Sequence, residues 1–294
     1  MKISNILGER ERGVSFEFFP PKTKKGQEPF MKVVNTLRLF DPMYVSVTYG
    51  AGGSTQETTR DTIFRIKEET DLNVMSHLTC IGATRKEMDS LLKDYISHGV
   101  DNILALRGDP PKGVKDFDPT KGEFKYARDL VQFVKSYGYF SVAVAVYPEG
   151  HQEAVNLEKD IEYTKVKVEA GADFAITQMF FDTSYYYNYM DKAVKAGINI
   201  PVIPGILPIT DFKKVKEFAS FCNTTVPQAI EKKMAPFLNS PDDMRKAGIE
   251  FAIIQCEDLL RNGVKYLHFY TLNKSESVTE VLYAISSYFD ELNK

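Results

Sequence analysis

The 294-residue sequence has little cysteine, no long apolar run and no large excess of either charge. Its three cysteines, Cys80, Cys222 and Cys256, form no CxxC pair. Such a sparse, odd set predicts a reducing compartment without a disulfide framework. No uncharged apolar stretch approaches the ~20 residues of a membrane helix. The apolar run near the N-terminus is too short for a signal peptide. We therefore expect a soluble, cytoplasmic protein.

Several functional signatures are also missing. The formal net charge of -3 gives no reason to expect nucleic acid or an anionic membrane as a partner. There is no P-loop, no HExxH and no GxSxG motif. No lysine lies deep in an apolar run near its carboxyl end, which argues against a Schiff-base aldolase.

Repeated apolar runs, rich in β-branched and aromatic residues, are the main feature that is present. There are eight, at residues 14–19, 43–49, 73–79, 102–107, 140–147, 173–180, 199–206 and 264–270. Helical patterns alternate with them, near residues 27–39, 55–70, 84–98, 123–137, 156–169, 183–196, 241–261 and 276–290. Thr84 and Glu87 have the spacing of a capping box. Five helical patterns end in glycine directly before a strand, as at Gly99 and Gly263.

Eight strand–helix units in a chain of this length predict an α/β fold, a (β/α)8 TIM barrel. We expect one catalytic domain over residues 1–294. A longer helical excursion at about 207–263 should hold an extra short helix near 227–235.

Polar residues follow the apolar runs where the strands of a barrel would end. They are Glu17, Thr48, Tyr49, His77, Arg107, Asp109, Tyr147, Gln178 and the segment 268–271. Active sites of TIM barrels lie at this end of the strands. The sequence therefore predicts a site at the mouth of the barrel.

Glu17 lies in a short apolar stretch, Ser15-Phe16-Glu17-Phe18-Phe19, which two prolines end. A carboxyl group among aromatic rings loses hydration, so we expect its pKa to be raised toward neutrality. Such a group can donate a proton near pH 7. An edge-strand glutamate that faces water would have the same local pattern, but the polar ends of the other strands favour the buried interpretation.

The sequences of two loops that follow strands each allow two interpretations. In Arg107-Gly108-Asp109 the charged pair either faces a ligand or braces the loop, and we favour the ligand-facing reading. The segment Gly50-Ala51-Gly52-Gly53 either holds an anion with its amide groups or is a plain βα loop. It fits neither the dinucleotide fingerprint nor the P-loop.

His77 interrupts an apolar run, and a lone strand histidine is usually a core residue. Together with Glu17, Asp109 and His268 it could instead form a metal site. A metal-dependent TIM-barrel lyase or aldolase is therefore the alternative function. A third reading is a barrel subunit that needs a separate electron-transfer partner.

Seven segments in this order resemble methylenetetrahydrofolate reductases: SFEFFPPK, YVSVTYGAGG, HLTCIGAT, ILALRGDPP, ITQMFFD, PGILPI and FHFYTLN. They cover residues 14–274. The resemblance implies a bacterial-type catalytic barrel that holds FAD. It implies ping-pong hydride transfer from NADH or NADPH, through the flavin, to methylenetetrahydrofolate, giving methyltetrahydrofolate for one-carbon metabolism and methionine biosynthesis.

The resemblance also implies roles for single residues. Glu17 matches the general acid, and Asp109 matches a carboxylate beside the flavin that also binds the pterin. Flavin-binding positions are Thr48, Tyr49, Ala51, His77, Arg107, Gly108, Asp109, Tyr126, Ala127, Tyr147, His151, Ala154, Asp160 and Lys167. Substrate-binding positions are Glu17, Asp109, Gln178, Lys214 and Lys274. No metal is implied.

This chain departs from the family pattern at four positions. Val166 and Tyr163 stand where enterobacterial members have an FAD-contacting arginine and an asparagine. Lys214 replaces a glutamine and Lys274 an arginine near the folate tail, so the bidentate fork of arginine is lost there. The residues identify neither the electron donor nor a homo-oligomer.

Overall fold

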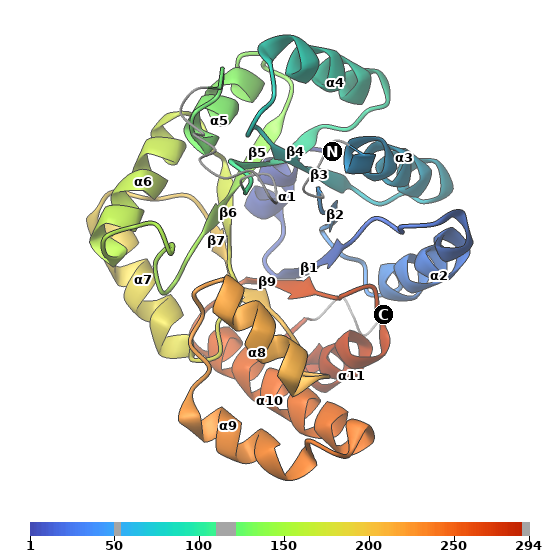
Figure 1. Ribbon diagram of the computed structural model, residues 1–294, viewed down its shortest axis with the longest axis vertical. Coiled ribbons are helices and arrows are strands. Elements are labelled where there is room, and N and C mark those ends of the chain that lie inside the picture. The colour runs from blue at the N-terminus through green and yellow to red at the C-terminus, as the bar shows by residue number, and fades with distance from the viewer. Residues whose placement is uncertain (50–53, 110–121, 290–294) are drawn as a thin grey trace.

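The apolar runs of the sequence form parallel strands that surround a common axis (Figure 1). A computed structural model describes residues 1–49, 54–109 and 122–289. The strands are β1 (Gly13–Phe18), β2 (Tyr44–Val47), β3 (Val74–Thr79), β4 (Asn102–Leu106), β5 (Ser141–Val146), β6 (Phe174–Thr177), β7 (Val202–Ile203), β8 (Gly205–Ile206) and β9 (Tyr266–Tyr270).

The seventh apolar run is divided between β7 and β8. Pro204 separates them; Val202 and Ile203 pair with β6, whereas Gly205 and Ile206 pair with β9. Together they form one segment that joins the last strand to the sixth. Each of the eight predicted runs therefore contributes to the wall, and the prediction of a TIM barrel is confirmed.

Helices cover the outside of the strands (Figure 1). The predicted ones are α2 (Gln27–Arg38), α3 (Ser54–Glu69), α4 (Arg85–Ser97), α5 (Ala127–Lys135), α6 (Leu157–Glu169), α7 (Thr183–Lys195), α9 (Gln228–Met234), α10 (Pro241–Arg261) and α11 (Glu276–Ala284). The predicted capping box of α4 is confirmed. The five helix-ending glycines all have positive φ. None of the helices in the described ranges is both long and apolar enough to cross a lipid bilayer.

Among the described residues, two α-helices were not predicted, α1 (Ile3–Glu9) and α8 (Phe212–Phe221). With 7 residues, α1 has about two turns, too few to show a period. In α8 the buried Phe212, Val215 and Ala219 have the spacing of a helix face and could have revealed it. The helix predicted over 123–137 begins only at Ala127, because Asp129 accepts hydrogen bonds from the backbone N–H groups of Lys125 and Tyr126.

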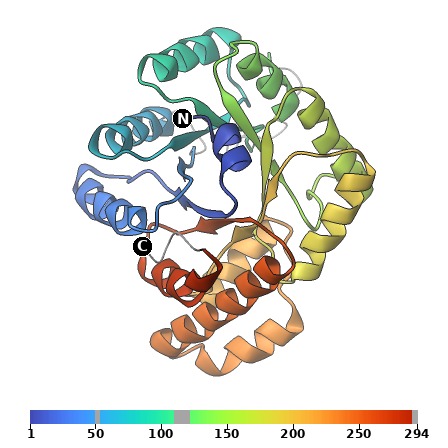
Figure 2. The ribbon, with the colours of Figure 1, turned by 180° about the vertical axis from the view of Figure 1, so that it is seen from behind.

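Alternating strand residues divide the core into two parts. Outward-facing residues such as Phe16 and Phe18 pack under the helices. Inward-facing residues such as Tyr44 and Phe174 fill the barrel together with Ile6 of α1. The backbone N–H of Ile3 donates to Asn102 at the start of β4, so α1 covers the amino-terminal ends of the strands (Figure 2).

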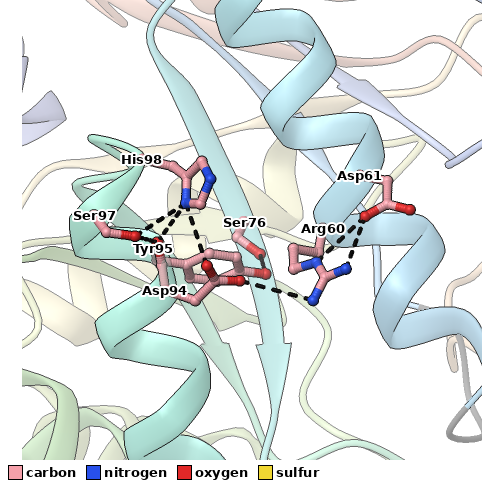
Figure 3. Close-up of polar contacts among 7 residues, drawn as sticks. All are labelled: Arg60, Asp61, Ser76, Asp94, Tyr95, Ser97 and His98. Atoms are coloured by element: carbon pink, nitrogen blue, oxygen red, sulfur yellow. Dashed lines mark hydrogen bonds and ion pairs between the residues drawn. The ribbon is translucent and has the colours of Figure 1, made fainter.

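The third strand is anchored from outside by α3 and α4 (Figure 3). The hydroxyl groups of Ser76 on β3 and Tyr95 on α4 are 2.9 Å apart and buried. Arg60 on α3 forms an ion pair of 3.8 Å with Asp94 on α4. Because successive residues face opposite sides of a strand, the outward Ser76 fixes the inward direction of His77.

Candidate active site

Glu17 lies between two histidines at the mouth of the barrel. Its Oε2 atom is 3.4 Å from Nε2 of His77 on β3 and 3.5 Å from Nε2 of His268 on β9. The side chains are 13% exposed for Glu17, 7% for His77 and 0% for His268. Three separate strands thus bring one carboxyl group and two imidazoles into contact.

The predicted rise in the pKa of Glu17 is wrong. Burial raises the pKa of Glu17, but the adjacent His77 and His268 outweigh burial and hold it below its ordinary value. The neighbouring Phe16 and Phe18 do not surround the carboxyl group, because they point into the outer core. Phe19 lies beyond the end of β1 and is 45% exposed. Burial also lowers the pKa of His77, against the attraction of Glu17.

Ser15 and two tyrosine rings hold His268 in place. The Ser15 hydroxyl is 2.8 Å from Nδ1 of His268. The ring of Tyr44 stacks on the imidazole at a centroid distance of 5.9 Å, and Tyr270 meets it edge-on at 5.4 Å. The imidazole plane is therefore fixed with Nε2 directed at Glu17.

A cavity of about 530 Å³ opens at the same end of the barrel, between the ends of β4 and β5 and the helices α5 and α6. Eight of the predicted flavin positions line it: Arg107, Tyr126, Ala127, Tyr147, His151, Ala154, Asp160 and Lys167. Tyr163 and Val166, two of the four positions at which the chain departs from the family pattern, line it as well.

Charged groups of the cavity are held by specific partners. Arg107 forms two hydrogen bonds with Glu153, of 2.5 and 2.7 Å. Lys167 donates to the backbone oxygen of Ala145 at 2.7 Å. Burial lowers the pKa of Lys167 to about 8. Burial raises the pKa of Asp160, whose Oδ2 atom is buried without a hydrogen-bond partner among the described residues.

The other predicted flavin positions lie around the mouth. Thr48 and Tyr49 follow β2, His77 lies beside Glu17, and Gly108 and Asp109 follow β4. Ala51 and the glycine-rich loop at 50–53 lie outside the described residues. At Gly108, φ is +88° and a Cβ atom would lie 2.8 Å from Ile81, so this turn requires glycine.

Asp109 and Glu17 each act electrostatically on a different tyrosine. Burial, together with charges that include Asp109, raises the pKa of Tyr147. Burial, together with charges that include Glu17 and Tyr147, raises the pKa of Tyr270. The negative charge of each carboxylate thus opposes ionisation of the tyrosine that it faces.

Residues 2–286 match the family model described as methylenetetrahydrofolate reductase. The chain belongs to the methylenetetrahydrofolate reductase family. It is 42% identical over 263 residues to 5,10-methylenetetrahydrofolate reductase of Salmonella typhimurium, which covers 90% of this chain and 87% of that protein. The resemblance drawn from the sequence is confirmed.

Two further comparisons concern a longer relative and a protein of similar fold. The chain is 36% identical over 292 residues to methylenetetrahydrofolate reductase (NADH) 1 of Arabidopsis thaliana, covering 96% of this chain and 49% of that protein. It thus spans about half the length of the plant relatives it matches. An uncharacterized protein from Clostridium thermocellum that binds two copies of 5-methyl-5,6,7,8-tetrahydrofolic acid aligns with a TM-score of 0.64, at 14% identity over 98% of this chain and 99% of that one. This likeness shows the shared fold.

The folate positions carried over from the reductase family follow the carboxyl ends of β6, β8 and β9. Gln178 follows β6, and its Oε1 atom accepts a hydrogen bond from the backbone N–H of Met179. Lys214 on α8 is exposed and pairs with Asp211 at 3.2 Å. Lys274 follows β9 and is exposed. Their assignment to substrate stays a prediction.

The residues named for the metal-dependent alternative are only partly brought together. Glu17, His77 and His268 are in contact, whereas Asp109 is exposed on the β4 loop. Across the part of the chain that the structure describes, no group of three or more His, Cys, Asp or Glu side chains has the arrangement of a metal site.

Sequence reasoning missed two residues that shape the site. Ser15 contacts His268, and its position two residues before Glu17, on the same strand face, was the available signal. Glu153 pairs with Arg107 from the loop before α6, and no pattern in the sequence marks it.

Proposed function

We propose that this chain is an FAD-dependent methylenetetrahydrofolate reductase working by a ping-pong mechanism with NADH or NADPH as donor. The observation that carries the proposal is the Glu17 carboxyl group, 3.4 and 3.5 Å from two imidazoles, at the same end of the barrel as a cavity lined by eight predicted flavin positions. Family membership supports the same conclusion. In this proposal residues 1–294 form one catalytic domain, which acts in the cytoplasm on methylenetetrahydrofolate.

The residues of the cavity fit an FAD molecule. The cavity volume of about 530 Å³ is in the range of ligand pockets. Arg107 and Lys167 supply cations for a diphosphate. The unpartnered Oδ2 of Asp160 can accept a hydrogen bond from a sugar or ribityl hydroxyl. When bound, FAD supplies a carrier for two electrons.

In this proposal Glu17 donates a proton to the substrate nitrogen whose bond to the bridging carbon must break. Ring opening then leaves an iminium cation that can accept hydride. A folate ring seated in the mouth would exclude water, and further burial raises the pKa of a carboxyl group. We therefore expect the pKa of Glu17 to be higher with substrate bound than in the free protein, so that the carboxyl group can carry the proton it donates.

The remaining predicted residues orient the substrate. The carboxylate of Asp109 favours the approach of a cationic iminium. Gln178 is proposed to bind the pterin. Lys214 and Lys274 attract the carboxylates of the folate tail as point charges.

The test measures two half-reactions separately in the Glu17→Gln variant: reduction of the flavin by NADH or NADPH, and its reoxidation by methylenetetrahydrofolate. With the protein loaded with FAD and oxygen removed, NADH or NADPH should still bleach the flavin absorbance at close to the wild-type rate. Reoxidation by methylenetetrahydrofolate should be lost, because glutamine carries no acidic proton. Glu162→Gln, an exposed change on α6, is the matched control.

Folate reduction by Glu17→Gln at the wild-type rate would remove Glu17 from this role. A colourless protein that binds no flavin would overturn the proposal as a whole. Bleaching of the flavin by NADH or NADPH alone would also show that no separate electron-transfer subunit is needed.

A further inference from the structure

The Ser15 hydroxyl has two partners but only one proton to donate. Its Oγ atom is 2.8 Å from Nδ1 of His268 and 3.4 Å from the backbone oxygen of Leu267. The side chains of Ser15 and His268 are both fully buried. Because neutral imidazole carries its proton on one nitrogen only, the direction of the Ser15 hydroxyl is tied to the tautomer of His268.

In the first arrangement Ser15 donates to Nδ1 of His268. The proton of His268 is then on Nε2, which points at Oε2 of Glu17. An N–H group in that position stabilises an ionised carboxylate.

In the second arrangement Ser15 donates to the carbonyl group of Leu267. Its oxygen then accepts a hydrogen bond from the protonated Nδ1 of His268, and the bare Nε2 faces Glu17. A lone pair in that position repels a carboxylate but accepts a hydrogen bond from a carboxylic acid.

We propose that Ser15 sets the tautomer of His268, so that Glu17 can gain or lose a proton while His268 stays neutral. The two arrangements differ by one proton, which Glu17 exchanges with water in the mouth of the barrel. Ser15 and His268 are thus positioning residues for Glu17, and this role rests on the proposed function of Glu17 as the acid.

Three further side chains face the pair from the neighbouring strands. From β3, the Nε2 atom of His77 lies 3.4 Å from the same oxygen of Glu17, and burial lowers the pKa of His77. From β2 and β9, Tyr44 and Tyr270 contact the His268 ring. Burial raises the pKa of both tyrosines. A buried imidazolium loses hydration free energy. A change of tautomer lets His268 adjust to the protonation of Glu17 without becoming charged.

Nitrogen NMR of the FAD-loaded protein, labelled with 15N in its histidine rings, tests the proposal directly. The sequence has only 4 histidines, and a His268→Gln variant identifies the signals of His268. As the pH is lowered through the titration of Glu17, the signals should change from the Nε2–H tautomer to the Nδ1–H tautomer. An imidazolium signal, or one tautomer at every pH, would overturn the proposal.

Substitution of Ser15 gives a second readout. In Ser15→Ala, Nδ1 has lost its closest partner, and a buried N–H without an acceptor is costly. His268 should therefore stay in the Nε2–H form, and the acid limb of the folate half-reaction should move to lower pH. Ser15→Thr keeps the hydroxyl group and should behave as wild type. An unmoved acid limb in Ser15→Ala would contradict the proposal, whereas failure of the reductase proposal itself would appear as absent folate reduction in wild type.

Discussion

Asp109 and Glu17 occupy contrasting surroundings at the mouth of the barrel. Glu17 is nearly buried between imidazoles, whereas Asp109 is exposed at the end of β4. The two acids therefore differ in exposure and in partners, with Glu17 facing His77 and His268 and Asp109 facing the open end of the barrel.

Removing the charge of Asp109 should make the bound flavin easier to reduce. In Asp109→Asn a negative charge that disfavours an electron-rich flavin is gone. The midpoint potential, measured by anaerobic dye titration, should become more positive. Asp191→Asn, an exposed change on α7, should leave it unchanged. A potential that is equal or more negative in Asp109→Asn would argue against a charge beside the ring.

Lys167 should make FAD binding depend on pH. Burial lowers the pKa of Lys167 to about 8, so its ammonium group is lost as the pH rises through that value. Affinity for FAD, followed by quenching of flavin fluorescence, should fall over this range. Riboflavin has no phosphates and should show no such fall, and neither should FAD with Lys167→Met. The same pH dependence for both flavins would contradict a role in diphosphate binding.

Helix α10 packs directly onto the segment that follows β8. A Cβ atom on Gly248 would lie 1.6 Å from the backbone oxygen of Ile209, so the helix axis can approach this closely only with glycine. Gly248→Ala should destabilise the protein by about 1–3 kcal/mol or more, measured by urea unfolding. Gly8 in α1 is the matched control, because nothing lies within 4 Å of its added Cβ. Gly8→Ala should stabilise by about 0.5–1 kcal/mol. Equal effects at both sites would refute the packing argument.

Most elements could be predicted because their signals are local. The residues that form an apolar run or a helix cap lie within a few positions of each other in the sequence. The eight apolar runs and the capping box at Thr84 were identified in this way. The strand ends placed Glu17, His77 and His268 together at the mouth, but which of their atoms approach each other was not predictable, since His268 is 251 positions from Glu17. The error in the pKa of Glu17 has the same origin: its sequence neighbours Phe16 and Phe18 face the outer core, and its spatial neighbours come from other strands.

The whole molecule separates stability from chemistry along the barrel axis. Helix α1 fills the amino-terminal end, whereas Glu17 and the cavity lie at the carboxyl end. Ile6→Ala should therefore cost about 2–5 kcal/mol of unfolding free energy and leave the activity per folded molecule unchanged. Ile254→Ala, at an exposed position on α10, should stay within about 0.5 kcal/mol of wild type. A loss of specific activity in folded Ile6→Ala would show that the two ends are coupled.

The split at Pro204 has a mechanical consequence for the barrel. Only two register pairs join β7 to β6 and two join β8 to β9, whereas five join β3 to β4. Proline also has no N–H to donate. The wall therefore has a seam next to the loops that carry the folate positions, and amides there should exchange with deuterium sooner than those of β3 and β4. Transient opening of the barrel wall at this seam would admit two bulky reactants in turn without displacing Glu17 on β1.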